Sequence, residues 1–338
     1  MEVFKAIVLG IIQGVTEFFP VSSSGHLVLV PFLFKWDYIP VYYSVMLHFA
    51  TLLSLVTVFY RDIGQIIKAF FVGLFVKNVR KSNPYFKFSL FIIIATIPGV
   101  IAGYFLQDRI EGFFSKPLYV GLFLLVTAAF LFVGEYFGKK FEKRNENSNL
   151  EINGNLNPVI EGASQKTNSI NLMVKDPELE INNQELKTKE NNSGTNVFNS
   201  RIKRLNFISA AVIGVGQAIA ILPGVSRSGS TISFARLFGI KREDCVRFSM
   251  LLSIPIIFGA FVLESYKSYN EVLSQDIHVI INIAVGFVFA YITGLFAIKF
   301  LLKFTKLRNL NYFAIYCIVL SAIVFILSLI NKGGGFFK

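Results

Sequence analysis

Six long runs of apolar residues dominate the chain, and short polar stretches separate them. A helix needs about 20 apolar residues to cross the hydrocarbon core of a membrane, and each run has this length with few internal charges. We therefore predict six transmembrane helices, at residues 42–60, 88–106, 118–137, 246–264, 281–299 and 311–330. A shorter apolar patch, Phe70–Val76, lies between Lys68 and Lys77, and its length suits a helix that lies along the membrane interface.

Two further apolar segments, residues 3–34 and 207–238, are each interrupted by polar residues. The first breaks at Pro20 and the serines that follow it, and the second breaks at Pro223 and a stretch of serine, arginine and glycine. Each half is too short to cross a membrane, so we predict that each segment forms a re-entrant hairpin of two short helices. Non-helical backbone at membrane depth is tolerated only where it contacts protein or a water-filled cavity.

The two interrupted segments are copies of each other. An offset of 204 residues aligns them without a gap, and the matches include Gln13 with Gln217, Ser22 with Ser226, Ser24 with Ser228 and Gly25 with Gly229. Apolar residues match easily by chance, whereas polar matches are harder to dismiss. The chain is therefore predicted to contain an internal duplication, with a first repeat at residues 1–137 and a second at 205–338.

Three predicted spans separate the copies, and this odd number gives the copies opposite orientations in the membrane. The lysine and arginine clusters all fall on one side of this topology, which the positive-inside rule makes cytoplasmic. The prediction is an all-α polytopic membrane protein built as an inverted-topology repeat, with a polar site near the midplane where the two breaks meet. Between the repeats, residues 138–204 include a polar stretch, Glu142–Asn199, which we expect to be a disordered cytoplasmic loop.

The composition excludes two large classes of protein. Hydrophobic residues make up 54% of the chain and charged residues 16%, against roughly 25% charged residues in soluble domains, which excludes a soluble globular enzyme. Cys245 and Cys317 lie in or beside apolar runs and are interpreted as free thiols, which excludes a disulfide-stapled domain. The net charge of +12 comes from clusters at the ends of apolar runs, a pattern typical of orientation in an anionic bilayer rather than of nucleic-acid binding.

The first break carries several groups that suit catalysis. Gln13 and Glu17 are four residues apart, so they share a helix face that points toward the break. An ionisable residue at membrane depth is costly and indicates function. Three serines and His26 follow, and we expect His26 to face Glu17 across the loop. Two alternatives stay open: Glu17 pairs locally within the bundle, and the serines only satisfy free backbone groups.

The second break places Arg227 at the position of Ser23 in the first. The planar guanidinium suits phosphate oxygens, and the N–H groups of a following helix N-terminus can be aimed at the same ligand. Gly224 and Gly229 allow the backbone to approach that ligand closely. The alternative is an internal ion pair between Arg227 and Glu17 without a ligand.

Together, the two breaks supply the parts needed for phosphoryl transfer from an anionic, lipid-borne substrate. Arginine and backbone amides would neutralise charge that develops on the phosphoryl oxygens. A hydroxyl or an imidazole would accept the phosphoryl group or position water. Glu17 would act as a base or help to hold a divalent cation.

The segments QGVTEFFPVSSSGH and PGVSRSGST resemble the signature motifs of the undecaprenyl-diphosphatase family, the bacitracin-resistance type of membrane phosphatase. The resemblance covers nearly the whole chain except the polar loop. It implies hydrolysis of undecaprenyl diphosphate to the monophosphate and inorganic phosphate, which recycles the lipid carrier of cell-wall synthesis. It also implies the bacterial inner membrane, an active site facing outward, a divalent cation (Mg or Ca) and a homodimer.

By motif position, the resemblance makes Glu17, Ser23, His26 and Arg227 the candidate catalytic residues. Ser23 is the expected nucleophile, activated by Glu17 or His26, with His26 as the competing nucleophile. Phosphate-binding roles carry over to Gln13, Ser22, Ser24, Ser226, Ser228, Gly229 and Thr231. Glu17 is also the candidate metal ligand, but a glutamine at position 13 leaves it as the only carboxylate of the pair and weakens a two-carboxylate site.

Two rival functions fit parts of the pattern. Inverted repeats with broken helices are also the architecture of secondary transporters, so a transporter or flippase of a lipid-linked phosphate is the main alternative. Type 2 phosphatidic-acid phosphatases have similar S-G-H and S-R elements, but they need a histidine a few residues after the S-R pair. The next histidine after Arg227 is His278, which disfavours this class.

Overall fold

The computed structural model describes residues 2–37, 39–114, 116–167 and 204–333, and these residues form helices and loops with no strand. In chain order the helices are α1 (Val3–Thr16), α2 (Ser23–Phe34), α3 (Val41–Phe75), α4 (Lys77–Ser82), α5 (Pro84–Phe114), α6 (Pro117–Thr167), α8 (Phe207–Ile219), α9 (Arg227–Arg236), α10 (Arg242–Lys267), α11 (Tyr269–Leu273), α12 (Ile277–Leu307) and α13 (Asn311–Gly333). The all-α prediction is confirmed for this part of the chain.

Six of these helices are long and apolar enough to cross a membrane, with mean hydropathies between 1.6 and 2.8. They are α3, α5, α6, α10, α12 and α13, and each contains one of the six predicted spans. The number and position of the candidate spans are therefore confirmed. Run length and hydropathy suffice here because a helix must satisfy its own backbone groups in lipid.

Two helices extend further than the sequence predicted. The Phe70–Val76 patch is not a separate interfacial helix, since α3 continues to Phe75 after a kink at Phe59. Residues 142–167, which we expected to be disordered, continue α6 as a helix to Thr167. Extending an existing helix needs no new nucleus, which explains how polar residues can prolong a packed span. The remainder of the predicted loop, residues 168–199, lies outside the described residues.

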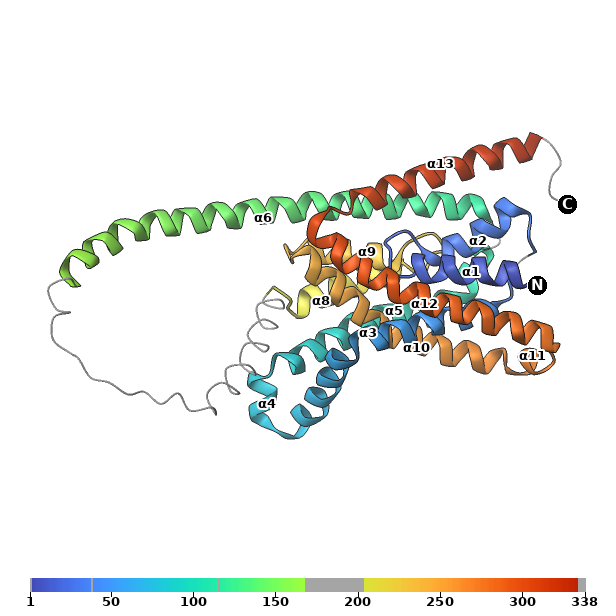
Figure 1. Ribbon diagram of the computed structural model, residues 1–338, viewed down its shortest axis with the longest axis horizontal. Coiled ribbons are helices and arrows are strands. Elements are labelled where there is room, and N and C mark those ends of the chain that lie inside the picture. Colours follow the sequence, from blue (N-terminus) through green and yellow to red (C-terminus); the bar gives the residue numbers. More distant parts are fainter. Residues whose placement is uncertain (1, 38, 115, 168–203, 334–338) are drawn as a thin grey trace.

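The two interrupted segments form the short helix pairs α1–α2 and α8–α9, in the middle of the molecule (Figure 1). Helices α6 and α13 lie side by side along one edge. The first helix of each pair packs mainly on the other half of the chain, α1 against α12 and α8 against α5. The second helices also pack on α6, and α9 packs on α10 as well.

Small residues make these close helix contacts possible. A Cβ atom added to Gly14 of α1 would lie 2.6 Å from the carbonyl oxygen of Ala290 in α12. A Cβ atom added to Gly214 of α8 would lie 2.7 Å from the carbonyl oxygen of Ala95 in α5. Contacts of this kind are typical of membrane helices, where small residues let backbones approach. Both broken segments are therefore pressed against a spanning helix from the other half.

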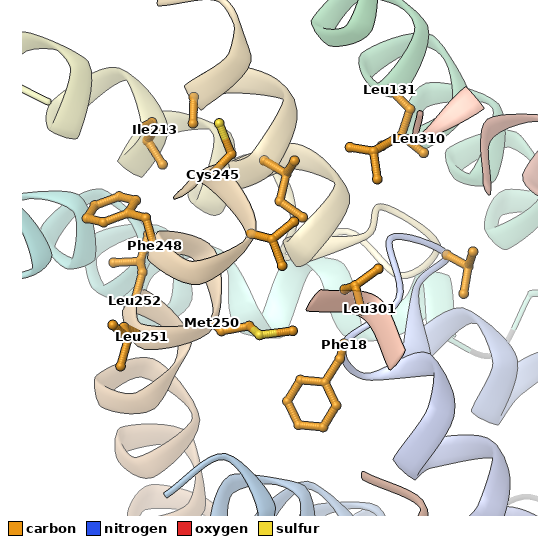
Figure 2. Close-up of a cluster of buried hydrophobic side chains, with 14 of the residues drawn as sticks. Phe18, Leu131, Ile213, Cys245, Phe248, Met250, Leu251, Leu252, Leu301 and Leu310 are labelled. Atoms are coloured by element: carbon orange, nitrogen blue, oxygen red, sulfur yellow. The ribbon is translucent and has the colours of Figure 1, made fainter. Parts of the chain in front are cut away.

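A buried apolar cluster holds the first break in place. Figure 2 shows Phe18, which directly follows Glu17, near Met250 of α10 and Leu301 of α12. Phe18 is only 2% exposed. Because protein interiors are packed as densely as organic crystals, this contact fixes the backbone beside Glu17.

Candidate active site

The carboxylate of Glu17 joins the two breaks. Its Oε1 accepts a hydrogen bond from Nη2 of Arg227 at 2.5 Å. Its Oε2 accepts from Nε2 of Gln13 at 2.9 Å and from Oγ of Ser23 at 2.7 Å. Glu17 is buried, with 5% of its surface exposed, so these donors compensate a charge that would otherwise be costly. Residues from distant parts of the chain thus meet at one carboxylate.

The first break is shaped by an unusual backbone conformation at Ser22. Its φ of 71° lies in the left-handed region that favours glycine, and such a conformation persists only where the surroundings hold it. Ser22 also caps α2, because its Oγ accepts a hydrogen bond from the N–H of Gly25 at 3.2 Å. The turn places Ser23 at the start of α2, where its hydroxyl reaches Glu17.

The second break is held by α6 and by its own serine cap. Gly224 has a φ of 103°, and an added Cβ would lie 2.5 Å from the carbonyl oxygen of Val120. Thr127 of α6 donates to the carbonyl of Gly224 at 3.0 Å and accepts from the N–H of Ser226 at 2.9 Å. Oγ of Ser226 accepts from the N–H of Gly229 at 3.0 Å and thereby caps α9. These contacts place Arg227 at the first turn of α9.

The other predicted phosphate-binding hydroxyls have partners inside the protein. Oγ of Ser24 lies 3.3 Å from that of Ser22. Ser228 donates to the carbonyl of Phe19 at 3.0 Å and so connects the two breaks. Thr231 donates to the carbonyl of Arg227 at 2.8 Å, and its Oγ1 lies 2.6 Å from Oγ of Ser249 in α10. In this structure these hydroxyls make hydrogen bonds within the protein, and their contact with phosphate remains a prediction.

His26 does not face Glu17 as we expected. Its Nδ1 lies 2.7 Å from the carbonyl oxygen of Ser22, which accepts only, so Nδ1 carries the proton. Its Nε2 lies 2.7 Å from the hydroxyl of Tyr316 in α13. The bond to Ser22 one turn earlier directs the ring toward α13, where it stacks on Tyr316. Both ring nitrogens are engaged, and this favours Ser23 over His26 as the nucleophile.

The exposed edge of the site is positively charged. The Arg227 side chain is 18% exposed and the Glu17 side chain only 3%. Together they line a small cavity with Ser249 and Ser253 of α10. Among the described residues, Glu17 alone accepts a hydrogen bond from the Arg227 guanidinium, which has five N–H groups in all. An approaching anion therefore meets free donors of Arg227 before it meets the carboxylate.

The sequence model of the family described as bacitracin resistance protein BacA matches residues 6–170 and 168–323. The chain belongs to the BacA family. A relative from Desulforudis audaxviator, named undecaprenyl-diphosphatase, is 31% identical over 98% of this chain and 100% of its own. A relative of the same name from Christiangramia forsetii is 34% identical over 96% of this chain and 98% of its own. Another, from Alkaliphilus metalliredigens, is also 34% identical, over 98% of this chain and 100% of its own.

Membership of the BacA family and the six apolar helices together identify a multi-pass membrane protein. The family assignment also agrees with the motifs that carried the resemblance in the sequence. The first motif runs from the last turn of α1 into the first turn of α2, and the second runs from a loop into the first turn of α9, so both meet at Glu17.

Two residues of this BacA-family site were missed in the sequence. His48 of α3 places its Nε2 3.5 Å from Oε2 of Glu17. Tyr316 of α13 contacts His26, which lies 290 residues earlier in the chain. A histidine inside an otherwise apolar run is itself a signal at membrane depth, and it could have drawn attention to His48. Nothing in the sequence pattern pairs Tyr316 with His26.

The residues at the site do not form a resident site for a divalent cation. Magnesium and calcium prefer several oxygen ligands, usually with carboxylates among them. Glu17 is paired with Arg227, and the described residues include no cluster of three or more His, Cys, Asp or Glu side chains. Oε1 of Gln13 is buried without a partner, but so is Oε1 of the matching Gln217. The orphaned oxygen is thus a feature of both copies and not a sign of a metal.

Proposed function

We propose that this protein hydrolyses undecaprenyl diphosphate to undecaprenyl phosphate and inorganic phosphate. The observation that carries the proposal is the carboxylate of Glu17, which accepts from the hydroxyl of Ser23 and from the guanidinium of Arg227. A base, a nucleophile and a fixed cation thus lie within one site. The name of the relatives, undecaprenyl-diphosphatase, supports the substrate.

The geometry suggests a two-step reaction. Oγ of Ser23 attacks the terminal phosphorus, its proton passes to Oε2 of Glu17, and the bond from phosphorus to the bridging oxygen breaks. Undecaprenyl phosphate leaves with the electron pair of that bond. Water then attacks the phosphoserine, the bond between phosphorus and Oγ breaks, and Glu17 returns the proton to Ser23. The free N–H groups of Arg227 stabilise the charge on the phosphoryl oxygens in both steps.

The proposed architecture is an inverted-topology repeat, residues 1–137 and 205–338, with two re-entrant hairpins. Packing between the two halves of the chain supports it, since α1 of the first half packs on α12 of the second and α8 of the second packs on α5 of the first. The serine caps support it too, because Ser22 and Ser226 make the same hydrogen bond to a glycine three residues later. Accessibility of single cysteines placed in the loops, measured in intact cells, tests this topology.

The same topology places the site on the outer side of the inner membrane and residues 142–199 in the cytoplasm. An outward site suits a lipid carrier that is released outside the cell and must be recycled, and loss of this recycling would sensitise cells to bacitracin. Homodimer formation also remains a prediction. Light scattering of the purified protein in detergent measures it directly.

The divalent cation, Mg or Ca, remains a prediction without a resident site, and no step above depends on one. Phosphate release with and without excess chelator tests the requirement. Glu17 is the one carboxylate at the site within the described residues, so we expect no binding of either cation to the protein alone by calorimetry. Tight binding without substrate would contradict this expectation.

The experiment that tests the function is phosphate release from undecaprenyl diphosphate by purified protein in detergent. No vectorial transport is possible there, so turnover distinguishes an enzyme from the rival transporter or flippase. We expect turnover by the wild type and turnover about 1,000-fold slower by Arg227→Ala. Absence of release from any polyprenyl diphosphate would favour the transporter.

A further inference from the structure

The imidazole of His48 lies near Oε2 of the Glu17 carboxylate. Its Nε2 lies 3.5 Å from Oε2, the same oxygen that accepts the hydroxyl proton of Ser23. Its Nδ1 lies 2.8 Å from the carbonyl oxygen of Ser44, one turn earlier in α3. The side chain is 28% exposed, so it lies at the open side of the site while Glu17 lies behind it.

The partners of the two ring nitrogens define the charge of this imidazole. A carbonyl oxygen only accepts, so Nδ1 carries a hydrogen. An ionised carboxylate also only accepts, and an Nε2 lone pair directed at it would be repelled. A ring with hydrogens on both nitrogens suits both neighbours, and its positive charge would attract Oε2 of Glu17. The carboxylate then has a cation on each oxygen, Arg227 on Oε1 and His48 on Oε2.

The second copy lacks the acid and the imidazole together. The offset of 204 residues places Ile221 at the position of Glu17 and Leu252 at the position of His48. Leu252 is fully buried in α10. The two polar residues are thus present together in one copy and replaced by apolar residues in the other, as expected if each depends on the other.

We propose that His48 is a positioning residue of the active site: a cationic imidazole on α3 that holds Oε2 of Glu17 toward the hydroxyl of Ser23. The proposal rests on the proposed function for its effect on rate. Gln13 approaches Oε2 from α1, Ser23 from α2 and His48 from α3, so three elements restrain one oxygen. Misplacement of a reacting group by about 1 Å costs about 100-fold in rate, which sets the expected effect.

Two substitutions and a matched control test the effect on rate. His48→Leu introduces the residue of the second copy and removes both ring nitrogens, whereas His48→Gln keeps an N–H donor. His278→Gln changes an exposed histidine in the first turn of α12, away from the site. We expect kcat for phosphate release to fall about 100-fold in His48→Leu with KM unchanged. We expect His48→Gln to recover most of the rate and His278→Gln to match the wild type.

A spectroscopic measurement tests the geometry without turnover. The chain has three histidines, so ¹⁵N-histidine labelling gives few ring signals, and His48→Gln identifies those of His48. We expect both ring nitrogens of His48 to be protonated in the wild type and one to lose its proton in Glu17→Gln. This measurement does not depend on which substrate the protein hydrolyses.

Either of two results would overturn the proposal. One is wild-type kcat in folded His48→Leu, and the other is an unprotonated ring nitrogen of His48 in the wild type. If His48→Leu fails to fold, the nitrogen signals decide the question. Failure of every variant and the wild type to release phosphate, with a doubly protonated His48, would reject the proposed function and retain the ion pair.

Discussion

Ser22 caps α2 by accepting from Gly25, and Ser226 caps α9 by accepting from Gly229 in the same way. In each break the hydroxyl of the serine two residues later lies beside the capping hydroxyl, at 3.3 Å in the first break and 3.1 Å in the second. The residue between these serines differs, since it is Ser23 in the first break and Arg227 in the second. The same serine cap therefore presents a hydroxyl from one copy and a guanidinium from the other.

Comparison of the two breaks distinguishes the residues that maintain the structure of the site from the residues proposed to react. The matched serines fulfil the same structural role in both copies, and the unmatched residues contact Glu17. Glu17 itself has an apolar counterpart, Ile221. We therefore expect changes at Glu17, Ser23 and Arg227 to act mainly on activity and changes at the capping serines Ser22 and Ser226 to act mainly on stability.

The largest effect is expected at Ser23. Ser23→Ala removes the proposed nucleophile, and the loss of a serine nucleophile costs about 10⁶-fold in a well-studied hydrolase, which is below detection here. Ser24→Ala is the comparison, and we expect a smaller loss from it, because the Ser24 hydroxyl lies beside that of Ser22 and not beside Glu17. Phosphate release from undecaprenyl diphosphate measures both. Equal rates in the two variants would contradict the assignment of Ser23 as the nucleophile.

The next effect is expected at Arg227. Arg227→Ser gives the second break the residue of the first, and removal of an arginine that stabilises a transferring phosphoryl group costs about 1,000-fold. Arg61→Ala provides a control, since the guanidinium of Arg61 bonds the neighbouring Tyr60 hydroxyl on an exposed part of α3. The same assay should show wild-type activity in Arg61→Ala. Wild-type activity in Arg227→Ser would remove the guanidinium from the mechanism.

A smaller effect is expected at the contact between His26 and Tyr316. Tyr316→Phe removes one hydrogen bond, which is worth about 1 kcal/mol and therefore less than about tenfold in kcat. His26→Gln should retain measurable turnover, because the proposed nucleophile is Ser23 and both ring nitrogens of His26 are engaged elsewhere. Loss of phosphate release in His26→Gln as complete as that in Ser23→Ala would favour the histidine as nucleophile.

The smallest effect is expected outside both breaks. Deletion of residues 145–199 should leave kcat and KM unchanged, because no contact of the site involves them within the described residues. The deletion keeps Glu142, whose Oε1 accepts from Nη1 of the fully buried Arg236 at 2.7 Å. A marked loss of kcat on deletion, measured in the same assay, would show a role for this region.

The spans and the positions of the breaks could be predicted from the sequence because they depend on local properties. Run length and hydropathy define the spans, and α1 and α8 end a few residues before Pro20 and Pro223. Helix ends were less predictable, since α3 and α6 continue past the apolar runs that define them. The ion pair of Glu17 with Arg227, one of the two alternatives considered, is present.

The orientation of individual side chains could not be predicted in the same way. His26 follows the serines of the first break in sequence, yet its ring faces α13, because Ser22 and Tyr316 hold its two nitrogens. His48 lies among apolar residues and meets Glu17 only after α1 and α3 pack together. Such pairs depend on tertiary packing and leave no periodic pattern in a single sequence.

The central claim is that the carboxylate of Glu17 serves both breaks at once. Phosphate release from undecaprenyl diphosphate by Glu17→Gln, in protein shown to be folded by size-exclusion chromatography, tests it most directly. The amide keeps the shape of the side chain but can neither accept the proton of Ser23 nor pair as an anion with Arg227. We predict no detectable turnover, and turnover at the wild-type rate would contradict the account.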